Sequence, residues 1–202
     1  LVKFDSSGTR VWGTFYGGTG SETGFSCATD AMGNVFLAGS TTSQSNIASA
    51  SAHQTISAGY TEGFLVKFSA GGVRQWGTYY GGAGDDGVYS CSTDPMGNVF
   101  ITGYSYTYGG PGISSPGSHQ PVHGGSINSD AFLAKFNSNG VRQWGTYYGG
   151  HYQDIGFSCA ADSIGNVYLA GSTDTYTGTV IASAASHQSV ASTGSEGYLV
   201  KF

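Results

Sequence analysis

The sequence is poor in charge, in proline and in patterns that favour helices. Only 9% of its 202 residues are charged, seven of these are basic, and the formal net charge is −5. A surface that binds nucleic acid needs clustered Lys and Arg, so no nucleic-acid partner is expected. The chain has no run of 18 apolar residues, which predicts no insertion into a membrane. No convincing amphipathic helix is present either.

Glycine and aromatic residues are abundant instead. The chain contains 35 glycines against four prolines, and aromatic residues make up 14% of it. This composition is typical of many short strands joined by tight turns. The chain has no initiator Met and no signal peptide, and Leu1 already lies inside a repeated element. We therefore expect it to be an excerpt of a longer protein.

One unit of about 66 residues recurs along the chain, with spacings of 64 to 68. Residues 72–82 are identical to residues 140–150. When the units are aligned, the same residue type recurs at equivalent positions, and each such set of residues is called a column. The clearest columns are Trp12, Trp76 and Trp144, then Cys27, Cys91 and Cys159, then Asp30, Asp94 and Asp162, then Asn34, Asn98 and Asn166. All seven basic residues fall in two further columns, which are Lys3, Lys67, Lys135 and Lys201, and Arg10, Arg74 and Arg142.

Each unit contains four strand-like segments. In the second unit they are Val88–Asp94, Asn98–Tyr104, Ala131–Phe136 and Val141–Tyr148. The sequence between the first two, Asp94-Pro-Met-Gly-Asn98, is a tight-turn sequence. Four antiparallel strands that repeat radially make a propeller blade. The predicted fold is therefore all-β, with tandem four-stranded β-propeller blades that form part of a larger propeller or array.

Three motifs carry a resemblance to a known family. They are Trp-Gly-Thr-Tyr-Tyr-Gly-Gly, Asp-x-x-Gly-Asn-Val-Phe-x-x-Gly and Phe-Leu-Val-Lys-Phe. Together they resemble the bacterial SBBP-type β-propeller repeat over essentially the whole chain. The resemblance implies a place in a large secreted or surface protein of bacteria and implies no reaction. The chain departs from the usual form with Cys at a small-residue position and His where an aromatic residue usually precedes Gln.

Similarity to the first strands of an NHL-type blade indicates which strand of each unit is innermost and which is outermost. Innermost strand A is expected at Phe25–Asp30, strand B at Asn34–Ser40, strand C at Phe64–Phe68 and outer strand D at Val73–Tyr80. The chain then divides into strands C and D of a preceding blade (1–23), two blades (24–87 and 88–155) and a partial blade without its last strand (156–202). Neighbouring blades of the same polypeptide, or other copies of it, are expected to supply the missing strands.

Cysteine and histidine each form a column with one residue per blade. The three cysteines lack CxxC spacing and are odd in number, so we expect them to be reduced and buried as small apolar residues. His53, His119 and His187 each precede Gln in a long loop. These histidines either pack inside the loop or form part of a ligand-binding surface, and the sequence leaves both alternatives open.

One column of acidic residues is a candidate for function. Glu22, Asp86 and Asp154 lie in the glycine-rich connection between strands D and A. One carboxylate per blade near a central channel could hold Ca²⁺ or a polar ligand, and a simple turn carboxylate is the alternative. A further column precedes strand C, where a solvated charge or a pair with the Lys column is expected; it consists of Glu62, Asp130 and Glu196.

No motif for a catalytic site appears, so the chain is predicted not to be an enzyme and to have no catalytic residues, metal site or required cofactor. The leading hypothesis is a structural or assembly module of a long extracellular or cell-surface protein of bacteria, such as an adhesin stalk or a filament. The alternative is a propeller that binds glycans or surface proteins through the long B–C loops at 41–62, 105–130 and 173–196. An enzyme whose site lies outside this excerpt is a third hypothesis.

Overall fold

The computed structural model describes residues 1–109, 112–125, 127–176, 180–192 and 194–202, which form strands, turns and loops without a helix. Within these ranges, no helix long and apolar enough to cross a bilayer occurs. The first strands are β1 (Val2–Phe4), β2 (Arg10–Gly13), β3 (Glu22–Thr29), β4 (Val35–Thr41), β5 (Glu62–Phe68) and β6 (Arg74–Tyr80). The remaining strands are β7 (Asp86–Thr93), β8 (Val99–Ser105), β9 (Asp130–Phe136), β10 (Arg142–Tyr148), β11 (Asp154–Ala161), β12 (Val167–Thr173) and β13 (Glu196–Lys201).

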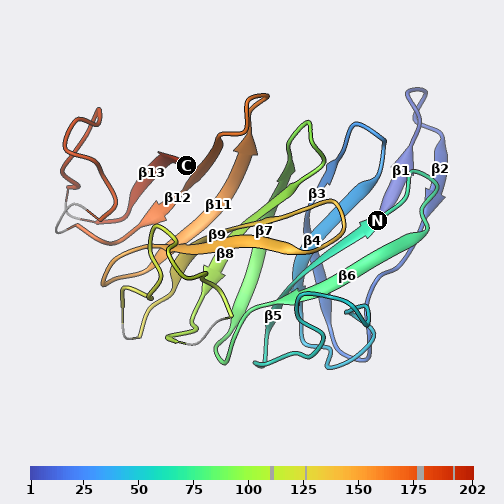
Figure 1. Cartoon of the computed structure of the whole chain (residues 1–202), viewed down its shortest axis with the longest axis horizontal. Coiled ribbons are helices and arrows are strands. Elements are labelled where there is room, and N and C mark those ends of the chain that lie inside the picture. The colour runs from blue at the N-terminus through green and yellow to red at the C-terminus, as the bar shows by residue number, and fades with distance from the viewer. Residues whose placement is uncertain (110–111, 126, 177–179, 193) are drawn as a thin grey trace.

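The strands form four antiparallel sheets in tandem. Two sheets have four strands each, in the orders β3-β4-β5-β6 and β7-β8-β9-β10. The β1-β2 sheet precedes them, and the β11-β12-β13 sheet follows them. Figure 1 shows these sheets one after another across the molecule in chain order. The predicted all-β fold with blade-like sheets is confirmed, and the order of strands A to D within a sheet is the predicted one.

The A strands lie at one edge of their sheets and contact each other, β3 against β7 and β7 against β11. The turn from strand A to strand B is built as expected. Asp30 Oδ1 accepts the backbone N–H groups of Met32 at 3.0 Å and Asn34 at 2.9 Å, as an Asx turn does. The Asp94 turn repeats the arrangement with the same distances.

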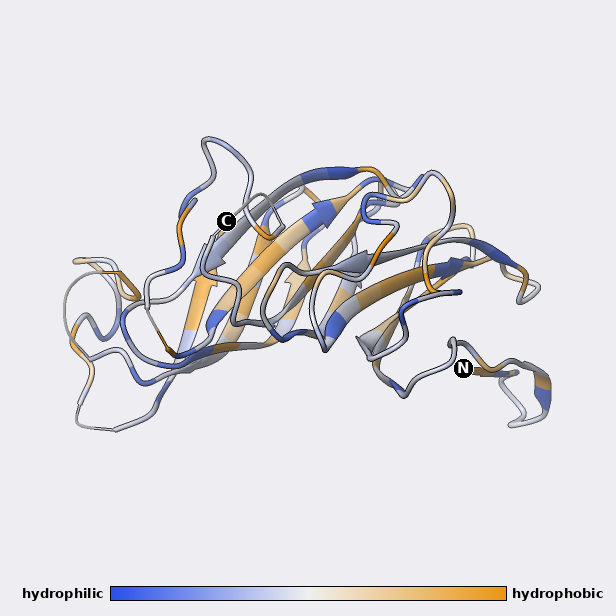
Figure 2. Ribbon diagram, turned by 90° about the horizontal axis from the view of Figure 1, so that it is seen from below, coloured by the Kyte–Doolittle hydropathy of each residue, from blue (hydrophilic) through white to orange (hydrophobic). Residues whose placement is uncertain are grey.

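The hydrophobic core lies between neighbouring sheets. Phe36, Leu65 and Tyr80 of one blade pack against Val88 and Ile101 of the next in a single buried cluster. A second cluster joins the blade β7–β10 to the sheet β11–β13. Figure 2 shows the hydrophobic residues concentrated along the strands in the middle of the molecule. Because each sheet buries its faces against its neighbours, a blade depends on adjacent blades for its stability.

Each A strand contains one β-bulge. The pairing register shifts between Gly24 and Ser26 in β3, between Val88 and Ser90 in β7 and between Gly156 and Ser158 in β11. A bulge leaves one extra residue outside the regular alternation and re-aims its side chain. The extra residues are Phe25, Tyr89 and Phe157.

The cysteines are all free, but the expectation that all three are buried is wrong for one of them. Cys91 and Cys159 are buried, whereas Cys27 is exposed. Cys91 Sγ lies 3.6 Å from Ser26 Oγ on the A strand of the preceding blade. Cys27 lies on the first A strand, so no such strand covers it.

In this 202-residue chain, one thiol should therefore react quickly with a thiol reagent and two should react only on unfolding. Burial raises the pKa of the Cys91 thiol to about 12 and raises that of Cys159, so both lack the reactive thiolate. Mass spectrometry of the native protein after a short pulse of iodoacetamide measures this. Cys27→Ser should abolish the fast reaction, and a second fast thiol would contradict the assignment.

Candidate functional site

Equivalent contacts recur at the junctions between blades. Tyr80 at the end of β6 donates its hydroxyl hydrogen to the Ile113 carbonyl oxygen, 2.6 Å away, in the B–C loop of the next blade. Equivalent bonds join Tyr16 to Ile47 and Tyr148 to Ile181. Trp76 Nε1 donates to the Ser138 carbonyl oxygen at 3.0 Å, in the C–D turn of the next blade. Trp12 does the same to Ala70 at 3.1 Å.

The acidic residues at the start of the A strands hold the loops around them. Asp86 Oδ2 accepts the Gly82 N–H at 2.7 Å and the Thr107 hydroxyl at 2.9 Å. Asp154 Oδ2 accepts the Gly150 N–H at 2.7 Å and the Thr175 hydroxyl at 3.3 Å. Glu22 likewise accepts hydrogen bonds from Gly18, Thr41 and Ser43. Each carboxyl ties its own D–A connection to the start of the following B–C loop.

The acidic residues that precede strand C lie in the same junctions. Glu62 and Asp130 are fully buried. A Cβ atom added to Gly81 would stand 2.1 Å from Glu62 Oε2 and 2.7 Å from Asp86 Oδ2, so both carboxyls contact this one glycine. We call Glu62 with Asp86, and Asp130 with Asp154 around Gly149, the junction carboxyl pairs; each joins two neighbouring blades.

The expectation for Glu62 and Asp130 is therefore wrong: they are neither solvated nor paired with the Lys column. The physical reason is that the D–A connection and the next A strand cover them. The lysines instead approach the turn carboxylates. Lys67 Nζ lies 3.6 Å from Asp30 Oδ2, and Lys135 Nζ lies 3.9 Å from Asp94 Oδ2.

Burial makes the junction carboxyls weak acids. It raises the pKa of Glu62 to about 7, and the charge of Asp86 adds to the effect. It raises the pKa of Asp130 to about 7, with a further contribution from Asp154, and that of Asp86 to about 6. Each pair is thus partly protonated near neutral pH.

Glu196, the third residue of the column that precedes strand C, shows how a neighbouring blade affects the pKa of these carboxyls. Glu196 at the start of β13 is only half-buried, and hydrogen bonds from Ser192 lower its pKa. No A strand follows β13 in this chain. The raised pKa of Glu62 and Asp130 is therefore a property of the junction and not of the blade alone.

The predicted ring of Glu22, Asp86 and Asp154 does not converge on one point, because each residue binds its own loop. Within the described ranges, no three His, Cys, Asp or Glu side chains form a group that could hold a metal ion. A Ca²⁺ site at these residues stays a prediction. We expect EDTA to leave the melting temperature unchanged in calorimetry, because each of these carboxyls is held by hydrogen bonds within its own loop; a fall that added Ca²⁺ reverses would contradict this.

The histidine column packs against aromatic rings at the junctions. The ring centroid of His53 lies 6.1 Å from that of Tyr80 and 5.8 Å from that of Phe136 in the next blade. Burial lowers the pKa of His53 to about 4, so its imidazole is neutral. His119 packs in the same way on Tyr148 and Phe202, and His187 is exposed. The binding role proposed for this column stays a prediction.

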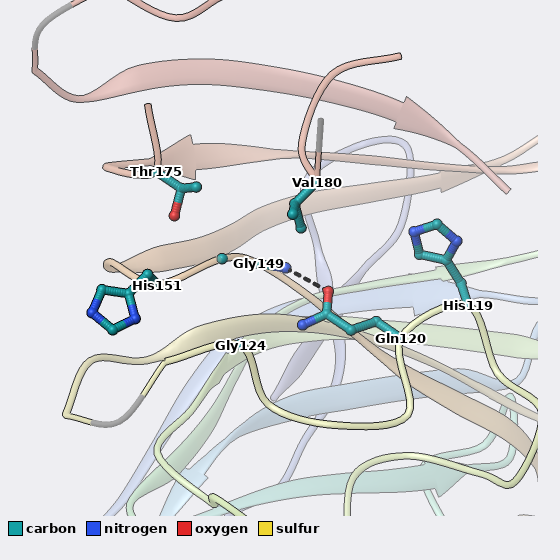
Figure 3. A pocket seen from close by; sticks show the side chains of 8 residues that line it. His119, Gln120, Gly124, Gly149, His151, Thr175 and Val180 are labelled. Carbon is teal, nitrogen blue, oxygen red and sulfur yellow. Dashed lines mark hydrogen bonds between the residues drawn. The ribbon is translucent and has the colours of Figure 1, made fainter. Parts of the chain in front are cut away.

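An open hollow of about 470 Å³ lies where the B–C loop of the second blade meets the D–A connection (Figure 3). Its lining includes His119, His151 and Val180, and Gln120 Oε1 accepts the Gly149 N–H at 3.0 Å. Parts of the predicted binding loops, residues 110–111, 126, 177–179 and 193, lie outside the described residues.

A row of aromatic residues on the A strands was not predicted. Phe25, Tyr89 and Phe157 occupy the bulges described above, and their rings contact one another across three sheets. The signal was present in the sequence, because the three residues form an aromatic column next to the acidic one. Its meaning depends on the bulges, which strand periodicity alone does not reveal.

The tandem sheets and repeated junctions define a segment of a β-propeller protein. The chain is similar to an uncharacterized WD repeat-containing protein of Acanthamoeba polyphaga mimivirus, with 30% identity over 162 residues. The match covers 74% of this chain and 11% of that protein, so the chain spans about a tenth of the length of this curated relative. No family model matches the chain, and the resemblance to SBBP-type repeats stays a prediction.

Proposed function

We propose that the chain is a non-catalytic structural module, a run of blades within a long extracellular or cell-surface protein of bacteria. The observation that carries this proposal is the recurrence of equivalent contacts from one junction to the next: the Tyr hydrogen bond at three junctions, and the Trp hydrogen bond and the carboxyl pair at two each. The Tyr hydroxyl, the Trp indole and the junction carboxyl pair all join one blade to the next. A repeat that carries both halves of its own interface can be extended by adding copies of itself.

The proposal has two parts, which separate experiments test. Electron microscopy of the full-length protein should show these repeats as a continuous propeller or array, and isolated, independently moving blades would contradict the structural role. An antibody against this segment should bind intact cells that produce the protein. Binding only after permeabilisation would contradict the surface location, which is supported by the SBBP resemblance alone.

A second candidate function is binding of a glycan or a surface protein through the long B–C loops. The hollow next to His119 and Gln120 favours it, because B–C loop and D–A connection residues line it together. Replacing His119 by Ala should then weaken binding in a glycan or protein array. The matched substitution of the exposed His187 should not, since this side chain does not line the hollow.

A further inference from the structure

The bulges of the A strands place an aromatic surface on the inner edge of the blades. Phe25 is 49% exposed and Phe157 is 53% exposed, although both lie within strands. Tyr89 lies between them and is half-buried. Its ring centroid is 5.2 Å from that of Phe25 and 5.9 Å from that of Phe157. The bulges thus turn three rings out of the core and into one row.

The middle blade extends this row with two further tyrosines. The ring centroid of Tyr104 lies 5.3 Å from that of Tyr89, and the ring centroid of Tyr106 lies 6.0 Å from that of Tyr104. We call these five rings the aromatic row. Because complete or partial sheets flank the middle blade on both sides, the exposure of its tyrosines does not come from a missing neighbour.

The two added tyrosines are departures from the repeat. Tyr104 stands where the other blades have Ser40 and Ser172. Its partner in the pairing register is Gly87, where the other blades have Thr23 and Ile155.

The two changes fit each other. A Cβ atom on Gly87 would stand only 2.6 Å from Tyr104 Cε1, so the glycine makes room for the ring. Neither change is needed to build a blade, since the neighbouring blades form without them. A pair of matched changes, in a buried glycine and a half-buried tyrosine, is what a specific site on an otherwise uniform scaffold requires.

The hydroxyl groups of this site are available to a ligand. In the core, Tyr79, Tyr80 and Tyr147 each donate a hydrogen bond to a backbone carbonyl oxygen. By contrast, the hydroxyls of Tyr89, Tyr104 and Tyr106 make no hydrogen bond within the part of the chain that the structure describes. The row therefore offers flat apolar faces and free hydroxyls together, which is the property of an amphipathic recognition surface.

We propose that the aromatic row binds a neutral oligosaccharide, with pyranose rings stacked on its faces and sugar hydroxyls bonded to Tyr89, Tyr104 and Tyr106. The lack of basic side chains in the row favours a neutral sugar over an anionic ligand. The basic columns lie on strands C and D, and Lys67 and Lys135 approach the turn carboxylates that follow the A strands, so the row itself contains no cation for a phosphate or a sulfate. The row itself consists of aromatic rings alone, without an aliphatic member.

Isothermal titration with cellohexaose, maltohexaose and chitohexaose tests the proposal on the 202-residue chain. We expect at least one of the three to bind. Tyr104→Ser, which installs the residue of the neighbouring blades, should weaken that binding about tenfold, equivalent to about 1.4 kcal/mol. Tyr89→Phe, which keeps the ring and removes one hydroxyl, should weaken it less.

The matched control is Tyr60→Ser. Tyr60 is 88% exposed and lies in a B–C loop outside the row, so its loss should leave the affinity unchanged. Unchanged melting temperatures would show that the variants are folded. The proposal is overturned if none of the three sugars binds at millimolar concentration, if Tyr104→Ser binds as tightly as the parent chain, or if Tyr60→Ser weakens binding equally. Binding of an apolar peptide to the row in place of sugar would also overturn it.

Discussion

Lowering the pH from 8 to 5 should stabilise this protein. The pKa of Glu62 in the folded chain is about 7, against an ordinary value of 4.5. Below pH 4.5 this group is protonated in both the folded and unfolded states, and its burial carries no ionisation penalty. As the pH rises from 4.5 to 7, the folded state resists ionisation and loses about 3 kcal/mol relative to the unfolded chain. Asp130 acts in the same direction, whereas the neutral His53, with a pKa of about 4, opposes it below pH 6.5, where the unfolded chain binds the proton more readily.

Urea unfolding at pH 5, 6, 7 and 8 measures this effect. Glu62→Gln and Asp130→Asn should raise the free energy of unfolding at pH 8 and flatten its pH dependence, because neither variant has a carboxyl to ionise. Glu196→Gln is the matched control, since the pKa of Glu196 is lowered and no following blade buries it. A free energy of unfolding that rises between pH 5 and 8 would refute the prediction.

Replacing Gly103 by Ala should destabilise the second blade by about 3 kcal/mol or more. Gly103 lies on β8 opposite the bulge of β7. A Cβ atom at this position would stand 1.8 Å from the Gly87 carbonyl oxygen, which belongs to backbone and cannot rotate away. The substitution therefore forces strands A and B apart and displaces Tyr89 from its bulge.

Thermal unfolding measures the loss of stability that this substitution causes. Near-ultraviolet circular dichroism measures the displacement of Tyr89. Gly13→Ala is the control, because this strand glycine has its nearest neighbour, Val2 Cγ2, at an ordinary contact distance of 3.6 Å. If Gly103→Ala unfolded at the same temperature as Gly13→Ala, the close approach across the bulge would not exist in solution.

The local features of the fold could be predicted from the sequence, because local residues determine them. The Asp30 turn depends on an Asp, a Gly and an Asn within five residues, and its hydrogen bonds form within that segment, at the position where a tight turn is predicted. The order of strands within a blade is predicted from the similarity to an NHL-type blade, and the structure has the same order. The role of Trp76 between blades also follows from its recurrence, because an aromatic residue repeated in every unit usually packs against the next.

The junctions could not be predicted, because they depend on segments about 25 residues apart that only the folded blade brings together. Glu62 looks like a charge at the edge of a strand until the connection after β6 passes over it. Phe25 looks like one more position in an alternating strand until the bulge shifts the register beside it. Both errors come from treating a strand as a regular, isolated object.

The junction carboxyl pairs also mean that blade docking and proton uptake are one event. A pair is complete only when a blade contributes its strand C acid and the next contributes its strand A acid. Each docking step near neutral pH therefore takes protons from solution, and the number taken up follows the number of interfaces and not the number of blades. An open row of blades has one interface fewer than a closed ring of the same size. Ring closure would consequently become more favourable in mildly acidic surroundings, and cooperativity between nearest neighbours would weaken as the surroundings become alkaline.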